Sequence, residues 1–179
     1  MFLLHLSPQE YLARGFFGGR YSEDDRWVDL LADQTGYEVR NAGANGREIP
    51  RDLCALRLLS QHAPVDMFLV MLGTNDLLQG ASASETAKRM DAFLKPLIPQ
   101  CRRILLIAPP PMARGAWVPT DDLVAESVQL SKEYKLLAQK LNVSFVDTRH
   151  WNIPLCFDGV HFTQAGHRMF AKNLLTYLS

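Results

Sequence analysis

The segment CFDGVHFTQAGH (156–167) places an aspartate and a histidine three residues apart, at Asp158 and His161. A carboxylate that orients an imidazole is one half of a hydrolytic site, because the oriented imidazole can act as a general base. The same residues also fit a helix N-terminus, with Thr163 as the cap and Asp158 as an ordinary loop residue. The residues at the ends of the other predicted strands decide between these two interpretations.

Two further segments carry groups of the kind that stabilise a developing oxyanion. LGTND contains Asn75, whose amide can direct an N–H donor into a cleft, and Gly73, which permits a tight turn. NAGANGREIP contains Gly46, whose backbone N–H can act as a second donor. Turn formation alone is the alternative for both segments, since Asn and Gly are common in turns. Together with the Asp–His pair, these groups make an acyl-transfer site that still lacks a nucleophile.

The elements that must position these residues follow from the hydrophobic pattern. Apolar runs predict strands at 2–6, 37–41, 66–72, 103–108 and 143–147. Helical patterns occupy 24–36, 50–61, 84–98, 121–141 and 163–178. Strands that alternate with helices indicate a parallel sheet covered on both faces. We therefore predict one α/β domain over 1–179, with a three-layer α/β/α architecture and a flavodoxin-like, doubly wound sheet of five parallel strands.

Ligands of such sheets bind beyond the carboxyl ends of the strands, near the point where the strand order reverses. The candidate residues fit this rule. Gly46 follows the second predicted strand, Asn75 follows the third, and Asp158 and His161 follow the fifth. We therefore expect these four residues to converge at one edge of the sheet.

The three segments NAGANG, LGTND and FDGVHFTQAGH resemble the second, third and fifth sequence blocks of the SGNH (GDSL-type) hydrolases. They occur in the same order, and the matches span 37–170. By position in these blocks, the resemblance implies that His161 is the general base, that Asp158 orients it, and that Gly46 and Asn75 form the oxyanion hole. It also implies the flavodoxin-like fold and ester hydrolysis without a cofactor.

The first block of the family departs from its usual pattern in this chain. The family carries Gly-Asp-Ser after the first strand, where this chain has His5, Leu6 and Ser7, followed by Pro8. Pro8 has no N–H and restricts Ser7 to extended backbone conformations, so the usual turn is altered. Ser7 is the candidate nucleophile, whereas Ser22, the other nearby serine, fits better as a helix cap.

These observations predict a serine ester hydrolase that acts on a small acyl or aryl ester, with a carbohydrate acetyl ester as one candidate. Its triad would be Ser7, His161 and Asp158, and its oxyanion hole Gly46 and Asn75. The alternative is a weak or inactive ligand-binding protein of the same fold, because the Gly-Asp-Ser block is not intact. A flavin-binding module fits the fold but leaves GTND and DGVH without a role.

Two other groups of residues are candidates for binding. Trp117 and Val118, in the proline-rich loop after the fourth strand, are predicted to line an acyl or alcohol pocket, with a plug of the core as the alternative. His167 lies six residues after His161. No cluster of further ligands accompanies this pair, so we predict a histidine on the helix surface and no metal site.

Composition excludes several classes of partner. Lys+Arg and Asp+Glu number 19 each, so no global field favours nucleic acid or an anionic membrane. The three cysteines are widely spaced and fit no zinc pattern. No apolar run approaches the roughly 20 residues of a membrane span, and MFLLHL is too short for a secretory signal. We expect a cytoplasmic protein whose partner is a small-molecule ester, with no nucleic acid or membrane partner.

Overall fold

The computed structural model describes residues 2–5, 21–51, 56–57 and 65–178. In this part of the chain, five parallel strands form one sheet in the order β2-β1-β3-β4-β5. The strands are β1 (Phe2–His5), β2 (Arg40–Asn41), β3 (Met67–Met71), β4 (Arg103–Ile107) and β5 (Ser144–Val146). Since β1 pairs with β2 on one side and with β3 on the other, the order reverses at β1. The predicted α/β class with a doubly wound parallel sheet is confirmed.

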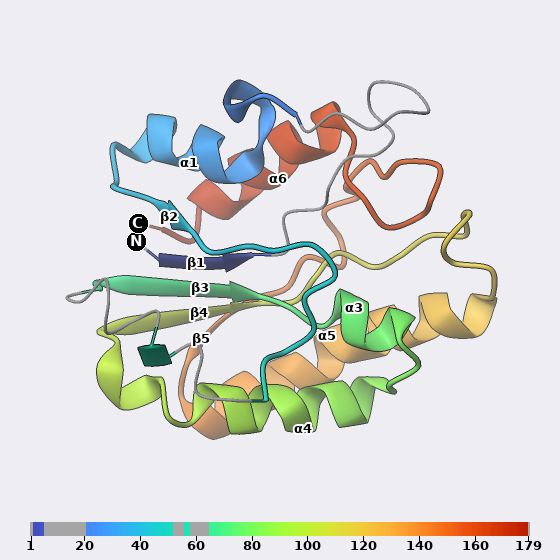
Figure 1. Cartoon of the computed structure of the whole chain (residues 1–179), viewed down its shortest axis with the longest axis horizontal. Coiled ribbons are helices and arrows are strands. Elements are labelled where there is room, and N and C mark those ends of the chain that lie inside the picture. The colour runs from blue at the N-terminus through green and yellow to red at the C-terminus, as the bar shows by residue number, and fades with distance from the viewer. Residues whose placement is uncertain (1, 6–20, 52–55, 58–64, 179) are drawn as a thin grey trace.

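Helices cover both faces of this sheet (Figure 1). One face carries α1 (Trp27–Thr35) and α6 (Gln164–Leu175). The other carries α3 (Thr74–Leu78), α4 (Ala83–Leu94) and α5 (Asp121–Leu141). Two short 3-10 helices, η1 (Glu23–Asp25) and η2 (Ile98–Gln100), precede α1 and β4. Among the described residues, no helix has both the length and the apolar composition needed to cross a bilayer.

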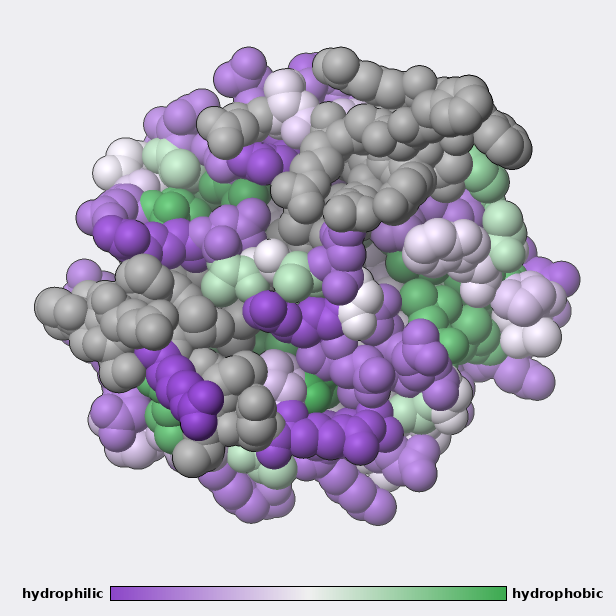
Figure 2. All heavy atoms as spheres, in the orientation of Figure 1, coloured by the Kyte–Doolittle hydropathy of each residue, from purple (hydrophilic) through white to green (hydrophobic). Residues whose placement is uncertain are grey.

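The core lies in two layers, one on each side of the sheet. Along β3, Phe68 and Val70 belong to the cluster beneath α4 and α5, whereas Leu69 and Met71 belong to the cluster beneath α1 and α6. All four side chains are buried, as predicted for a central strand of a covered parallel sheet. Hydrophilic residues dominate the described surface in the view of Figure 2, with smaller hydrophobic areas between them.

Local sequence signals account for several helix ends. Ser82 and Glu85 form a capping box at the start of α4. Thr163 accepts a hydrogen bond from the backbone N–H of Gly166 at the start of α6, so the helix-cap interpretation of this residue is confirmed. Gly36 ends α1 with φ 67°, a left-handed conformation that favours glycine.

Three elements differ from the prediction or lie outside it. The predicted strand at 37–41 is reduced to the exposed pair Arg40–Asn41, because this edge strand pairs with β1 over only two residues. The helix α3 was not predicted, since five residues are too few to show a helical period. The predicted helix at 50–61 falls largely outside the described residues.

Candidate active site

Asp158 and His161 form a close pair in the turn before α6. Asp158 Oδ2 lies 2.7 Å from His161 Nδ1. The other carboxylate oxygen, Oδ1, accepts the backbone N–H groups of Val160 at 2.8 Å and His161 at 2.9 Å. The Asp158 side chain is fully buried, and that of His161 is 13% exposed. The turn therefore fixes the carboxylate, and a small part of the His161 side chain remains exposed to solvent.

The charge state of Asp158 sets the role of the imidazole. Burial raises the pKa of Asp158, but hydrogen bonds from the His161 ring and from the two backbone N–H groups outweigh it, so the pKa lies below its ordinary value. An ionised carboxylate only accepts hydrogen bonds, so Nδ1 of His161 must carry the ring proton. Nε2 then presents a lone pair, which is the arrangement of a general base.

The loop after β4 holds the turn that contains Asp158. The backbone N–H of Ala113 donates to the Gly159 carbonyl at 2.9 Å, and that of Trp117 donates to the Asp158 carbonyl at 3.0 Å. Gly159 has φ 81°, and a Cβ at this position would lie 2.0 Å from the Ala113 carbonyl oxygen. Only glycine permits this close approach of the two backbones.

The same loop brings an aromatic ring against the imidazole. Trp117 packs edge-on to His161, with ring centroids 4.9 Å apart, and 49% of Trp117 stays exposed. Val118 is fully buried and belongs to the core cluster beneath α4 and α5. We therefore assign Val118 to the core, which was the alternative to a pocket wall, and keep Trp117 as the candidate substrate contact.

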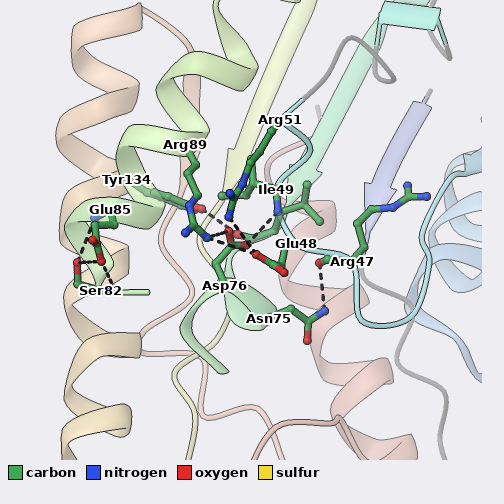
Figure 3. A network of polar contacts seen from close by, with 11 residues as sticks. Arg47, Glu48, Ile49, Arg51, Asn75, Asp76, Ser82, Glu85, Arg89 and Tyr134 are labelled. Carbon is green, nitrogen blue, oxygen red and sulfur yellow. Dashed lines mark hydrogen bonds and ion pairs between the residues drawn. The ribbon is translucent and has the colours of Figure 1, made fainter. Parts of the chain in front are cut away.

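Asn75 contacts Arg47, the residue that follows Gly46 in the chain (Figure 3). Gly73 is the N-cap residue of α3, and its φ of 119° lets the chain turn into α3 two residues after β3 ends, as the tight-turn interpretation predicted. Asn75 Nδ2 donates to the Arg47 carbonyl at 3.1 Å, next to Gly46 in the chain. The amide has two N–H groups, so one can hold this bond while the other is directed at an oxyanion.

These groups emerge from the carboxyl ends of β2, β3 and β5, at the edge toward which the strand arrows point in Figure 1. Asp158 and His161 meet in one pair, and Asn75 meets the loop of Gly46. The candidate nucleophile Ser7 lies outside the described residues. Ser22 is exposed, precedes η1 as its N-cap residue, and donates from Oγ to Asp25 at 3.1 Å.

Two residues behave differently from their sequence-based interpretation. His167 is only 2% exposed, so the prediction of a surface histidine is wrong. It lies on the inner face of α6, where its ring packs edge-on to Phe162 and its Nδ1 accepts the backbone N–H of Trp27 at 3.3 Å.

Asp76 is fully buried and both of its carboxylate oxygens accept hydrogen bonds, although the sequence indicated only a turn residue. Within the described ranges, no group of three or more His, Cys, Asp or Glu side chains is arranged to hold a metal ion.

Comparison with known proteins adds independent evidence. The model of the GDSL-like lipase/acylhydrolase family matches residues 12–169, a range that begins after Ser7 and includes Gly46, Asn75, Asp158 and His161. A search of curated proteins gives no match.

Solved esterase structures share the fold over nearly the whole chain. A carbohydrate acetylesterase family member from Sinorhizobium meliloti is 25% identical with a TM-score of 0.83, covering 99% of this chain and 96% of its own. A putative arylesterase from Agrobacterium tumefaciens is 25% identical with a TM-score of 0.78, covering 99% and 97%. The M. smegmatis aryl esterase is 24% identical with a TM-score of 0.77, covering 99% of both chains, a likeness of fold alone. The chain therefore belongs to the GDSL-like lipase/acylhydrolase family, a family of carboxylic ester hydrolases.

Proposed function

We propose that this protein is a serine esterase that hydrolyses small acyl or aryl esters, carbohydrate acetyl esters among them, through Ser7, His161 and Asp158. The observation that carries the proposal is the buried Asp158 carboxylate held 2.7 Å from Nδ1 of His161, because a proton on Nδ1 that faces this carboxylate leaves Nε2 as a proton acceptor. A carboxylate fixed by two backbone N–H groups is a rigid support for this imidazole.

In the proposed mechanism, Ser7 Oγ attacks the ester carbonyl while Nε2 of His161 takes the hydroxyl proton. The negative charge on the carbonyl oxygen is stabilised by the N–H groups of Ser7 and Gly46 and by the Asn75 amide. The proton on Nε2 passes to the departing alcohol, and the acyl group stays on Ser7. Water, deprotonated by the same imidazole, then releases the carboxylic acid and restores the serine.

The position of the Trp117 side chain favours substrates whose leaving alcohol contains a ring. Its ring packs against the imidazole of His161 and is about half exposed, so it is available to contact the alcohol part of an ester that reacts beside His161. With an aryl leaving group, such a pair of aromatic rings would contribute about 0.5–1.5 kcal/mol beyond area burial. Two structural relatives carry names that refer to carbohydrate acetyl esters and to aryl esters, and the alcohol part of both kinds of ester contains a ring.

Purified protein should hydrolyse 4-nitrophenyl acetate and acetylated xylose, with kcat/KM falling as the acyl chain of the nitrophenyl ester lengthens. Release of nitrophenolate and of acetic acid measures the two reactions. Folded protein that hydrolyses no ester of the series would contradict the proposal and favour the inactive, ligand-binding alternative. A preference for long acyl chains would retain the esterase but reject the small-ester substrate class.

Asn75→Ala should lower kcat on 4-nitrophenyl acetate by about 10² to 10³, the usual cost of losing one oxyanion donor. The loss of its bond to Arg47 should cost only about 1 kcal/mol of stability, so the protein should stay folded. Asn173→Ala, near the end of α6, is the matched control and should keep the wild-type rate. An unchanged rate would remove Asn75 from the mechanism, and a collapse of the melting temperature would favour a purely structural turn.

A further inference from the structure

We infer that the ion pair between the buried Asp76 and the partly exposed Arg89 positions the oxyanion hole, with both residues acting through Asn75 and the loop of Gly46. The inference rests on the proposed function, because it assumes that Asn75 and Gly46 donate to the oxyanion. Neither Asp76 nor Arg89 is expected to touch the substrate.

The loop that carries Gly46 depends on contacts made by its neighbours. Gly46 lies in an exposed turn with φ 64°, and a Cβ built on it would meet nothing within 4 Å. The two residues that attach this loop to α3 follow it directly. The backbone carbonyl of Arg47 accepts a hydrogen bond from the Asn75 side-chain amide at 3.1 Å. The backbone N–H of Ile49 donates to Asp76 Oδ2 at 3.0 Å.

Asp76 connects three separate segments. Its Oδ2 accepts a hydrogen bond from the backbone N–H of Ile49 in the loop. Its Oδ1 accepts a hydrogen bond from Nη1 of Arg89 in α4 at 2.8 Å. The carboxylate itself belongs to α3 and is fully buried. A buried carboxylate is tolerated only where charge and hydrogen bonds compensate it, and Arg89 provides the compensating charge. Arg89 thereby allows Asp76 to bind the loop.

Arg89 also reaches the loop directly. The same Nη1 atom lies 3.4 Å from Glu48 Oε2, and Arg51 Nη2 lies 3.6 Å from that oxygen. Glu48 stands between the two anchored residues Arg47 and Ile49 in the chain. Figure 3 shows Arg89 beside both carboxylates, with the Asn75 bond to the same loop nearby.

Asn75 and Asp76 are consecutive residues of α3, and each makes one hydrogen bond to the loop. A change in one of these bonds should therefore change the geometry of the other. Loss of the Asp76 anchor should let the loop shift relative to the Asn75 amide. Oxyanion donors act on charge that develops in the transition state, so a shift should lower kcat more than it changes KM. A misplacement of about 1 Å can cost up to 10²-fold in rate.

The test compares Arg89→Ala, Arg89→Lys and Lys95→Ala on 4-nitrophenyl acetate. Arg89→Ala should lower kcat by about 10- to 10²-fold and change KM less than about 2-fold. Arg89→Lys should restore part of kcat, because a single nitrogen makes both carboxylate contacts. Lys95→Ala breaks the ion pair of an exposed lysine with Asp91 at the C-terminal end of α4 and should leave kcat unchanged. Should Arg89→Ala fail to fold, Arg89→Gln keeps an N–H donor and can replace it in the test. Its kcat should also fall while its KM stays nearly unchanged.

A double mutant separates this inference from the proposed function. If Arg89 acts through Asn75 and the loop of Gly46, the part of its effect that passes through Asn75 is already lost in Asn75→Ala, so adding Arg89→Ala to that variant should lower kcat by a smaller factor than Arg89→Ala does alone. A full multiplicative loss would overturn the inference, as would an unchanged kcat in Arg89→Ala while Asn75→Ala is impaired, or a change confined to KM. If Asn75→Ala itself has wild-type kcat, the proposed oxyanion hole is wrong and the inference falls with it.

Discussion

Ser7→Ala is expected to lower ester turnover by on the order of 10⁶, because removing the nucleophile of a triad removes the covalent route. Leu6 stands where the family carries Asp, and Pro8 restricts the backbone of Ser7, so we expect a low wild-type rate. A low starting rate limits how large a loss of turnover can be measured. The decisive readout is therefore covalent. A fluorophosphonate should form an adduct that maps to a peptide containing Ser7, and this adduct should vanish in Ser7→Ala.

Ser22→Ala is the matched control for this experiment. Ser22 is exposed and its hydroxyl donates to Asp25, so its replacement should leave both labelling and turnover near the wild-type level. An adduct on Ser22 would move the nucleophile to that residue. A folded protein in which no serine is labelled would favour the inactive member of the family over the esterase.

The parts of the fold that could be predicted from the sequence are those that depend on local or periodic patterns. The continuous apolar run at 66–72 marked β3 because a strand covered on both faces has no polar side. The predicted helix at 121–141 matches α5, whose N-cap is Thr120. The Asp158–His161 pair could be found because both residues lie in one short turn.

The parts that could not be predicted depend on contacts between distant segments. Asp76 resembles a turn residue until Ile49 and Arg89 are seen to bind its two oxygens. Val118 and Trp117 are adjacent in the chain, yet one is fully buried and the other half exposed, because only the packing of the loop decides which side chain faces inward. His167 is buried for the same reason, since the inner face of α6 is set by the sheet and not by residue type.

His161→Ala is expected to cost about as much as Ser7→Ala, and the double mutant little more than either single variant, because a nucleophile and its base act as one unit. His150→Ala, at an exposed position, is the matched control and should keep the wild-type rate. Steady-state hydrolysis of 4-nitrophenyl acetate measures all four proteins. Losses that multiply in the double mutant would contradict a shared mechanism for Ser7 and His161.

Asp158→Asn should then show whether the carboxylate orients the base or only builds the turn. An asparagine can keep Oδ1 as the acceptor of the Val160 and His161 backbone N–H groups, so the turn and the melting temperature should be largely preserved. Its NH2 group would face Nδ1 of His161 and donate to it, which places the ring proton on Nε2 and removes the base. Turnover should therefore fall by about 10⁴ in a folded protein. A folded Asp158→Asn variant with the wild-type rate would mean that Asp158 serves the turn alone.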